Sequence, residues 1–488
     1  MKWQNIILPV CLFAVVFLTA CSDDDSFTTS SSCHLTFSEN EVSLDTLFSQ
    51  TPSSTRSFWV YNNSGKALRC SNVRLEKGNQ TGFRVNVDGT FLGKEVGYQM
   101  HDVEIHAGDS IRVFVELTSP ANGMDEPQKV TDNIVFHLES GVEQKISLNA
   151  WTWDAVKERT LVIDKDTIIS SAKPIVVYDS IKVNEGATLT LSAGTKMFFH
   201  ENAGIVVDGS LRCLGEAKNE VVLRGDRLDR MFDYLPYDLV SGQWQGIHFT
   251  SSSYDNVLQY TDVHSTYDGI VCDSSDVAKE KLSVEQSTIH NCQGYGILLQ
   301  NVKAHIYNSQ ITNVLRDCLC IDGGDVQVNG CTIAQFYPFD SARGAAIRFT
   351  SLFPLQQLRV LNSIITGYAD DMLMGEKADT IKAFNYSFAD CIIRTPKIET
   401  ADSIHFTHVM YEDISNTTSQ GYKHFKLVDG STQHYDFHLA KESDAIGKAN
   451  VETTLPLDRD GNVRGEKPCV GAYNYRPILQ IKTTDLCN

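Results

Sequence analysis

The chain repeats the pattern Val284-Glu-Gln-Ser-Thr-Ile289 as Ile306-Tyr-Asn-Ser-Gln-Ile311 and again as Val328-Asn-Gly-Cys-Thr-Ile333. Apolar and polar residues tend to alternate in these copies, and an aliphatic residue ends each one. The terminal aliphatic residues of six such copies are Val263, Ile289, Ile311, Ile333, Ile365 and Ile393. These positions lie 26, 22, 22, 32 and 28 residues apart. A period in the low twenties without helical spacing predicts a solenoid of stacked strand coils, a parallel β-helix.

A second apolar group follows several of these copies. It reads Gly269-Ile-Val271, Gly296-Ile-Leu298, Leu319-Cys-Ile321, Ala345-Ala-Ile347 and Met372-Leu373. Each coil would therefore bury one or two aliphatic side chains that only a neighbouring coil can cover. Where the step between copies exceeds 22 residues, a loop should leave the solenoid, and loops are where binding usually occurs. The predicted loops are 273–280, 337–343 and 375–384.

Residues 1–20 have the features of a secretory signal peptide. Lys2 precedes an apolar core, Ile6 to Leu18, that is too short to span a bilayer as a mature helix. The core ends in Leu18-Thr-Ala-Cys21, which resembles the lipobox of bacterial lipoproteins. The resemblance implies that Cys21 carries the lipid and becomes the first mature residue. The protein would then be attached to a membrane through an N-terminal lipid anchor.

Residues 21–34 form an acidic and Ser/Thr-rich segment that we expect to be a flexible tether. Its beginning, Ser22-Asp-Asp-Asp25, resembles the acidic signal with which Bacteroidota direct lipoproteins to the cell surface. The resemblance implies an outer membrane lipoprotein that is exposed on the cell surface. The formal net charge of −19 argues against a nucleic-acid partner.

Residues 35–155 alternate short apolar strands with turns rich in Gly, Asn and Asp. Ile111-Arg-Val-Phe-Val-Glu-Leu117 is one of the strands, and Asn62-Asn-Ser-Gly65 is one of the turns. About seven or eight strands in this length predict a β-sandwich. The stretches at Leu44-Asp-Thr-Leu-Phe48 and Ile105-His-Ala-Gly-Asp-Ser-Ile111 resemble immunoglobulin-like modules that precede β-helices in Bacteroidota lipoproteins of unknown function. We expect this domain to hold the solenoid away from the membrane.

Residues 156–430 are expected to form the solenoid. Its opening strands lie in Ile181-Lys-Val-Asn-Glu-Gly-Ala-Thr-Leu-Thr-Leu191 and Gly204-Ile-Val-Val-Asp-Gly-Ser-Leu211, where Gly, Asn and Asp provide tight corners. These coils resemble those of right-handed parallel β-helix proteins of the pectin-lyase-like kind. The predicted fold class is therefore all-β, with a right-handed parallel β-helix preceded by an immunoglobulin-like β-sandwich.

Residues 431–488 form a closing segment in which the repeat pattern ends. Asp458-Arg-Asp-Gly-Asn-Val-Arg464, followed by Val470-Gly-Ala-Tyr473, resembles the end of many secreted bacterial β-helices. Asp458 and Asp460 suggest calcium, but the stretch lacks the further oxygen ligands of a calcium loop. We expect a turn that covers the open edge of the last coil. No cofactor is expected, although calcium stays open.

The segment Asp226 to Gln243 interrupts the strand pattern and is the candidate ligand-binding loop. Aromatic side chains next to charged ones could form a platform on which a sugar stacks. The candidate residues are Arg227, Arg230, Tyr234, Tyr237 and Trp244. In the alternative interpretation these aromatic side chains only cover the edge of the coil.

The sequence does not identify catalytic residues. A glycoside hydrolase of this fold would show clustered aspartates and a Gly-His-Gly motif; Asp370-Asp371 is the only double aspartate in the repeats, and Gly-His-Gly does not occur. His264, with Asp262 and Asp268 nearby, is equally weak evidence. The sequence therefore favours a non-catalytic binding or scaffold surface for glycans or a partner protein. A polysaccharide lyase or glycoside hydrolase and a purely structural component are the alternatives.

The cysteines predict neither a complete set of disulfides nor a metal site. Cys33 could pair with Cys70, and Cys469 with Cys487. Cys318-Leu-Cys320 lacks the spacing of a zinc-binding pair. A stacked interior ladder is favoured because free cysteine packs as a small hydrophobic side chain. The cysteines expected in this ladder are Cys272, Cys292, Cys318, Cys320, Cys331 and Cys391.

Overall fold

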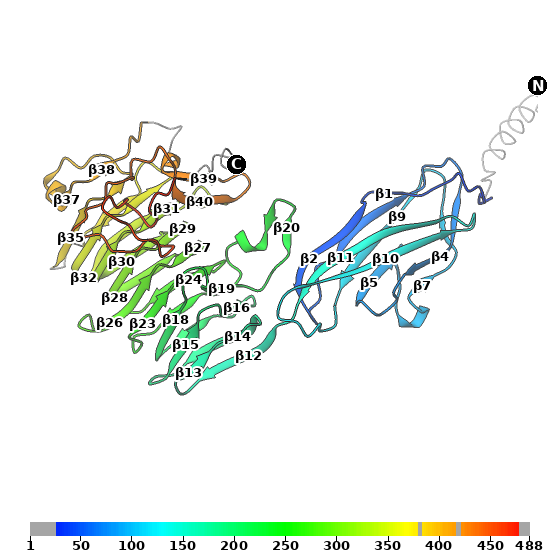
Figure 1. Ribbon diagram of the computed structural model, residues 1–488, viewed down its shortest axis with the longest axis horizontal. Coiled ribbons are helices and arrows are strands. Elements are labelled where there is room, and N and C mark those ends of the chain that lie inside the picture. The colour runs from blue at the N-terminus through cyan, green and yellow to red at the C-terminus, as the bar shows by residue number, and fades with distance from the viewer. Residues whose placement is uncertain (1–25, 379–382, 416–420, 478–488) are drawn as a thin grey trace, which may run out of the picture. The chain divides into compact units, whose positions relative to one another are not determined.

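The computed structural model describes residues 26–378, 383–415 and 421–477 (Figure 1). The chain divides after Trp153 into two compact units, and each is described by itself. Among the described residues, none of the helices has the length and hydrophobicity needed to cross a membrane.

The first unit is an immunoglobulin-like sandwich of two sheets. One sheet has the strand order β1-β3-β9-β5-β6, and the other has the order β2-β11-β10-β4-β7, with β8 paired to β4. All pairs are antiparallel except β2 with β11. The elements are β1 (Thr36–Phe37), β2 (Glu41–Phe48), β3 (Arg56–Tyr61), β4 (Leu68–Leu75), β5 (Phe83–Val87), β6 (Thr90–Phe91), η1 (Lys94–Val96), β7 (Gln99–Met100), β8 (Val103–Ile105), β9 (Ser110–Leu117), β10 (Gln128–Leu138) and β11 (Glu143–Trp153).

The core of the sandwich follows the period-two pattern of the sequence. Strand β9 buries Ile111, Val113 and Val115, while the residues between them face outward. Cys70 is completely buried and Cys33 is half-buried, and both thiols are free. The suggested Cys33–Cys70 disulfide is therefore wrong. Cys487 lies outside the described residues, so the other suggested pair is not described.

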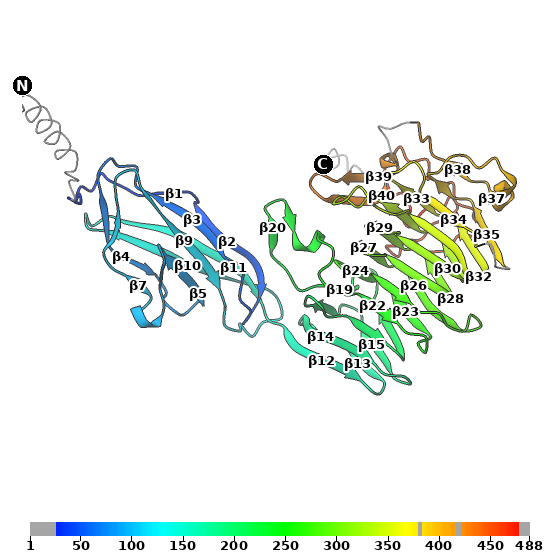
Figure 2. The same cartoon turned by 180° about the vertical axis from the view of Figure 1, so that it is seen from behind.

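The second unit is a right-handed parallel β-helix whose strands stack in three columns, named A, B and C here. The long strands β12 (Val156–Ile163), β14 (Ile175–Val183), β28 (Ile297–Tyr307), β30 (Leu319–Asn329) and β32 (Ile347–Leu361) each turn a corner and belong to two columns. Figures 1 and 2 show the stacked coils from opposite sides.

Each column is a ladder of parallel strands from successive coils. Column A contains the first parts of β12 and β14, then β16 (Lys196–Phe199), β19 (Val221–Gly225), β24 (Thr261–His264), β27 (Thr288–Cys292), β29 (Gln310–Val314), β31 (Thr332–Gln335), β33 (Ile364–Gly367), β36 (Ile392–Ile393) and β38 (Met410–Tyr411). Column B contains the second parts of β12 and β14, β17 (Ile205–Val207), β22 (Ile247–Phe249), β25 (Ile270–Cys272), the first parts of β28, β30 and β32, and β34 (Leu373–Glu376). Column C contains β13 (Thr167–Ile169), β15 (Thr188–Ser192), β18 (Ser210–Leu214), β23 (Asn256–Gln259), β26 (Glu280–Glu285), the second parts of β28, β30 and β32, β35 (Phe384–Ala389) and β37 (Phe406–Thr407).

The register of the ladders confirms the sequence repeat. The six aliphatic residues that end the repeats are direct partners in column A, from Val263 through Ile311 to Ile393. The second apolar group pairs in column B, where Ile270 lies beside Ile297. These side chains point inward and are almost completely buried. A coil is thus stable only because its neighbours cover it.

The cysteines are buried as predicted, but they do not stack on one another as a ladder: Cys272 pairs with Leu299, and Cys292 pairs with Val314. All six cysteines are buried, and Cys320 alone lies outside the central apolar cluster. Burial raises the pKa of the Cys272 thiol to about 12, so it stays protonated at neutral pH. Interior packing, not chemistry, is the role that this environment permits.

Short elements lie outside the columns. The loop that interrupts the repeats forms the hairpin β20 (Arg230–Phe232) and β21 (Leu235–Pro236), followed by η2 (Tyr237–Leu239). Near the end of the unit are η3 (Ala401–His405), η4 (Tyr422–His424) and the hairpin β39 (Phe425–Asp429) and β40 (His434–Leu439).

The closing segment differs from the sequence prediction. Instead of covering the last coil, residues 450–475 run along the outer side of column A, where the red chain crosses the coils in Figure 1. Arg459 donates to Glu220 and Thr288, Arg464 donates to Asn308, and the amide of Ala472 donates to Thr332 Oγ1. These partners lie on several successive coils, so the segment fastens the coils together from outside.

Candidate functional site

The outer face of column A changes character along the solenoid. Its outward residues flank the buried aliphatic residue of each strand, because neighbouring strand residues point to opposite faces. At one end they are charged or polar, and toward the other end each pair includes one apolar residue. From β24 to β36 the outward pairs are Asp262 and His264, Thr288 and His290, Gln310 and Thr312, Thr332 and Ala334, Ile364 and Thr366, and Ile392 and Arg394.

The charged end holds a cluster of Asp262, His264 and His290. Strand pairing places His264 directly beside His290, and their rings stack with centroids 4.6 Å apart. Asp262 Oδ1 lies 2.9 Å from His264 Nδ1 and 3.2 Å from His290 Nε2. One carboxylate oxygen therefore binds two imidazoles from adjacent coils.

The interrupting loop adds a second carboxylate to this cluster. Asp238, on η2, lies with Oδ1 3.0 Å from His264 Nε2 and forms an ion pair with Arg224. Arg224 follows the buried Leu223 on β19, one coil before His264, and its guanidinium lies over the Phe198 ring. Both nitrogens of His264 thus contact carboxylates.

The electrostatics of the cluster favour bound positive charge. Burial opposes ionisation of His264, but Asp262 and Asp238 outweigh it and raise the pKa of His264 to about 9. Burial likewise opposes ionisation of Asp262, yet His264 and His290 hold its pKa well below the usual range. The pKa of Asp238 is also lowered, against the effect of burial, chiefly by His264 and Arg224.

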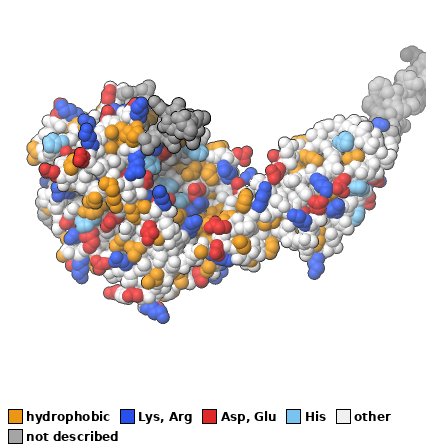
Figure 3. Space-filling view, viewed as in Figure 1, with side chains coloured by type: hydrophobic (Ala, Val, Ile, Leu, Met, Phe, Trp, Pro, Cys, Tyr) orange, Lys and Arg blue, Asp and Glu red, His pale blue; other side chains and the backbone are white. Residues whose placement is uncertain are grey.

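A trough of about 190 Å³ adjoins the cluster on the outer face of column A. His290, Gln310 and Thr312 come from the coils, Leu239 from η2, and Asp436 and His438 are among the residues contributed by β40. Figure 3 shows a shaded hollow on this face, with histidine side chains visible in it. The interrupting loop, the coils and the closing segment therefore border one hollow with polar and apolar side chains in its lining.

Most polar groups around the trough hold one another in place. The Tyr473 hydroxyl donates to Gln310 Oε1 at 2.7 Å, and Gln310 Nε2 donates to Thr312 Oγ1 at 3.0 Å. His438 contacts Asp436 and Asp460 through its two ring nitrogens. Asn313 is the exception: it is 3% exposed, it lines the trough, and its Oδ1 has no partner among the described residues.

The residues singled out in the interrupting loop do not form one platform. Arg227 forms an ion pair with Asp229 and lies over the Tyr237 ring, 3.9 Å from its centroid. Arg230 Nη1 donates to the backbone oxygen of Asp233. Tyr234 is 57% exposed and stacks only on Phe232 among the described rings. From this loop Asp238 reaches the cluster, and the sequence pattern did not single it out.

Trp244 requires a correction. It is completely buried, stacks on Phe199 with ring centroids 4.2 Å apart, and donates from Nε1 to the His264 backbone oxygen. It belongs to the core and cannot contact a ligand in solution. Its indirect role is to support the strand that carries His264. Cys21, the predicted lipidation site, lies outside the described residues.

The other acidic candidates have structural partners. Asp268 Oδ1 accepts the backbone amide of Tyr295. Asp370 pairs with Arg394, and Asp371 accepts from Thr395. Asp458 accepts the backbone amides of Asp460 and Asn462 within its own turn.

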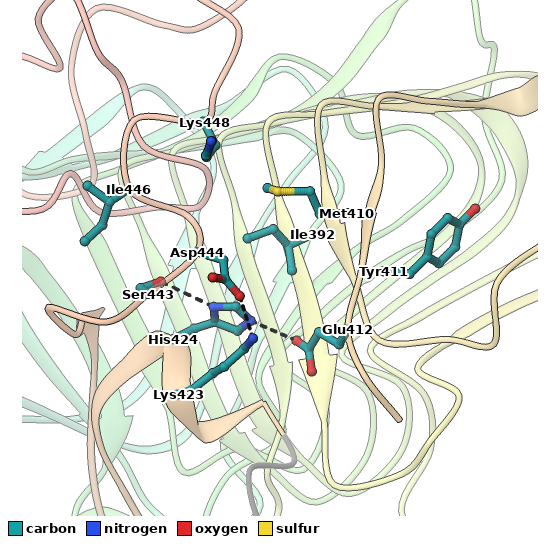
Figure 4. Close-up of a pocket in the computed structure, with 10 residues that line it drawn as sticks. All are labelled: Ile392, Met410, Tyr411, Glu412, Lys423, His424, Ser443, Asp444, Ile446 and Lys448. Carbon is teal, nitrogen blue, oxygen red and sulfur yellow. Dashed lines mark hydrogen bonds and ion pairs between the residues drawn. The ribbon is translucent and has the colours of Figure 1, made fainter. Parts of the chain in front are cut away.

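A second hollow, of about 330 Å³, lies at the apolar end of column A (Figure 4). Ser443 Oγ and Glu412 Oε1 lie on opposite sides of the His424 ring, each 3.3 Å from a ring nitrogen. The order of groups is that of a hydrolase triad, but the contact between His424 and Glu412 lacks hydrogen-bond geometry. Glu412 also pairs with the buried Arg394. We therefore assign this network to attachment of the closing segment.

Comparisons with known proteins add little. No protein-family model and no curated protein matches the chain. A structure of the catalytic unit of a GH87 α-1,3-glucanase from Streptomyces thermodiastaticus is 11% identical, with a TM-score of 0.25 over 73% of this chain and 89% of that one. A family 123 glycoside hydrolase from Clostridium perfringens (6% identity, TM-score 0.18) covers 26% of this chain and 30% of its own. A PapD-like domain of human CEP192 (9%, TM-score 0.17) covers 28% and 94%. These TM-scores are too low to support an argument, and the fold rests on the strand pairings.

Proposed function

We propose that the trough on column A binds a saccharide and that the protein presents this trough at the cell surface. The observation that carries this proposal is Asn313 Oδ1, a buried acceptor that has no partner among the described residues and belongs to a residue lining the trough. Buried polar groups normally have a partner, so this atom favours a ligand that donates a hydrogen bond. Carbohydrate hydroxyls are such donors.

The size and lining of the trough also favour a sugar. Its volume of about 190 Å³ is below the range of about 300–1,000 Å³ typical of drug-sized ligands. This volume suits a short part of a glycan chain better than a large folded partner. Amide, hydroxyl, imidazole and carboxylate groups line it, with the rings of Tyr435 and Tyr473 beside them.

Binding can be tested with one matched pair of variants. Asn313 has φ of 55° and Asn301 has φ of 45°, so glycine replaces either without backbone strain. Full-length protein in mild detergent should be retained on particular glycans of a polysaccharide array. Asn313→Gly should weaken retention at least about tenfold, and Asn301→Gly should not. Equal retention by both variants would place the binding site elsewhere.

A second candidate function is cleavage of the glycan. Asp262 contacts His290, and His290 lines the trough, which is an arrangement suited to proton transfer. The same array should therefore be scored for new reducing ends, which indicate hydrolysis, and for unsaturated ends, which indicate elimination. Binding without new ends supports the non-catalytic function. Failure to retain any glycan would leave binding of a partner protein or a structural role as the remaining candidates.

The proposed location rests on the sequence. The apolar segment ending at Cys21 and the acidic residues after it support a lipid-anchored protein on the outer surface. Cys21→Ala should abolish acylation and release the protein from membranes. Protease added to intact cells should remove the unmodified protein, and complete protection would contradict surface exposure.

A further inference from the structure

The cluster of Asp262, His264 and His290 has a feature that saccharide binding does not explain. Three potential ligand atoms, one oxygen and two nitrogens, all lie within 4.8 Å of one another. Two of the separations are 2.9 Å and 3.2 Å. Metal–ligand bonds of about 2.0–2.1 Å place neighbouring ligand atoms about 3 Å apart. The separations from Asp262 Oδ1 therefore match those around a bound transition metal ion.

The fold fixes this arrangement. Val263 lies between Asp262 and His264 in the sequence, and Ile289 directly precedes His290. Both aliphatic residues are stacked in the buried core of column A. Asp262 and His264 must then point outward on one coil, and His290 on the next. Such ligands are held by strand register instead of a mobile loop, which is the preorganisation that a metal site needs.

Asp238 occupies the position of an outer partner. A histidine that binds a metal through one ring nitrogen almost always donates from the other to a carboxylate, carbonyl or water. His264 directs Nδ1 toward Asp262 and has Nε2 3.0 Å from Asp238 Oδ1. Arg224 in turn pairs with Asp238 and holds it. Two carboxylates against one guanidinium leave the site with an excess negative charge when the imidazoles are neutral.

We propose that Asp262 Oδ1, His264 Nδ1 and His290 Nε2 bind one divalent transition metal ion, of which Zn²⁺ is the preferred example. Two imidazoles and one carboxylate favour such ions over Ca²⁺ and Mg²⁺, which prefer oxygen ligands. Because His290 also lines the trough, the remaining coordination positions are available to a ligand there. This inference does not depend on saccharide binding.

The control is another histidine of the solenoid. His305 Nδ1 lies 2.9 Å from Glu280 Oε1, the same separation as that of His264 Nδ1 from Asp262 Oδ1 but without hydrogen-bond geometry. Only the cluster brings three such ligands together among the described residues. Both histidines lie on β-helix strands, so His305→Ala matches His290→Ala in size and setting.

Calorimetric titration of the chelator-treated full chain with Zn²⁺ tests the proposal. We expect one ion per chain, weaker binding of Mn²⁺, and no competition from Ca²⁺. His290→Ala and Asp262→Asn should lower Zn²⁺ affinity at least about 100-fold, Asp238→Asn about 10- to 100-fold, and His305→Ala less than twofold. The visible spectrum of added Co²⁺ reports the ligand set directly and does not require any variant to fold.

Several outcomes would overturn the metal site. Absence of stoichiometric binding, unchanged affinity in His290→Ala, or an equal loss in His305→Ala would each do so. Asn313→Gly separates the two proposals because it should weaken glycan retention while leaving the Zn²⁺ titration unchanged. Loss of the metal result alone would leave the saccharide proposal intact.

Discussion

The two ends of the outer face of column A contain similar groups used in different ways. At one end, His264 and His290 share Asp262 beside an adjoining trough. At the other, His424 and Arg394 meet Glu412 beneath the closing segment, where all three are buried. Contact between a histidine and a carboxylate is thus not itself a sign of function. What differs is the setting: His290 lines a trough formed with the interrupting loop, whereas Glu412 and His424 line a hollow beneath the closing segment and Glu412 pairs with the buried Arg394.

The largest effect is expected at the covered end. Arg394→Met removes the arginine cation from Glu412, which is 8% exposed, and leaves the buried carboxylate without that ion pair. Breaking a buried ion pair in this way costs about 3–5 kcal/mol. Denaturant unfolding of the Asp154–Asn488 unit, followed by circular dichroism, measures the loss. Arg343→Met is the control. Within the described part of the chain Arg343 lies over the Tyr368 ring and forms no ion pair, so its loss should cost at most about 1 kcal/mol.

The charged end should make the free energy of unfolding depend on pH. In the chelator-treated protein the pKa of His264 is raised to about 9, above its ordinary value of 6.5. The contribution of His264 to the free energy of unfolding is therefore fully present below pH 6.5. It is lost as the pH rises through 9, by up to about 3 kcal/mol. The pKa of Asp262 is lowered, so its contribution is present above about pH 4 and is lost in acid. Free energies of unfolding between pH 5 and 10 measure the His264 dependence, and the Asp262 dependence requires a series below pH 4.

His264→Gln provides the matched comparison for the pH series. It should flatten the decline between pH 7 and 10, while His305→Ala should leave it in place. A variant lacking His264 that still loses the same stability would show that other groups titrate in this range, and the electrostatic distinction between the two ends would fail.

The structural features behind these predictions differ in how well they can be predicted from the sequence. The inward ladder could be predicted because Val263, Ile289 and Ile311 recur at the coil length and must all be buried. The paired apolar residues Ile364-Ile365 and Ile392-Ile393 carried a further signal: two adjacent apolar residues on a strand imply that both faces are covered. That signal indicates that another segment covers the outer face of these strands, as the closing segment does.

The site itself could be predicted only in part. Asp262 and His264 are two residues apart and so lie on one face of a strand. Their relation to His290 depends on the register of a 26-residue step, which a loop makes irregular. Asp238 approaches through a non-repetitive loop, whose path no period determines. The prediction that Trp244 contacts a ligand is wrong for a related reason: an aromatic residue next to a loop can point into the core or toward solvent.

A smaller effect is expected where the closing segment borders the trough. Tyr473→Phe removes the hydroxyl that donates to Gln310 and should cost about 1 kcal/mol, the net value of one hydrogen bond. Because Gln310 lines the trough, the same change should also weaken glycan retention. Unchanged stability together with unchanged retention would show that the closing segment does not organise this surface.

The smallest effect is expected at Tyr234. Its ring is 57% exposed and stacks on Phe232, which is itself 53% exposed, so Tyr234→Ala should change the free energy of unfolding by less than about 0.5 kcal/mol. Trp244→Ala, at the end of the same loop, should instead cost about 3–5 kcal/mol because it empties a buried site. Glycan retention decides whether Tyr234 has another role. If Tyr234→Ala weakens retention without changing stability, the ligand extends from the trough onto the hairpin that carries Tyr234.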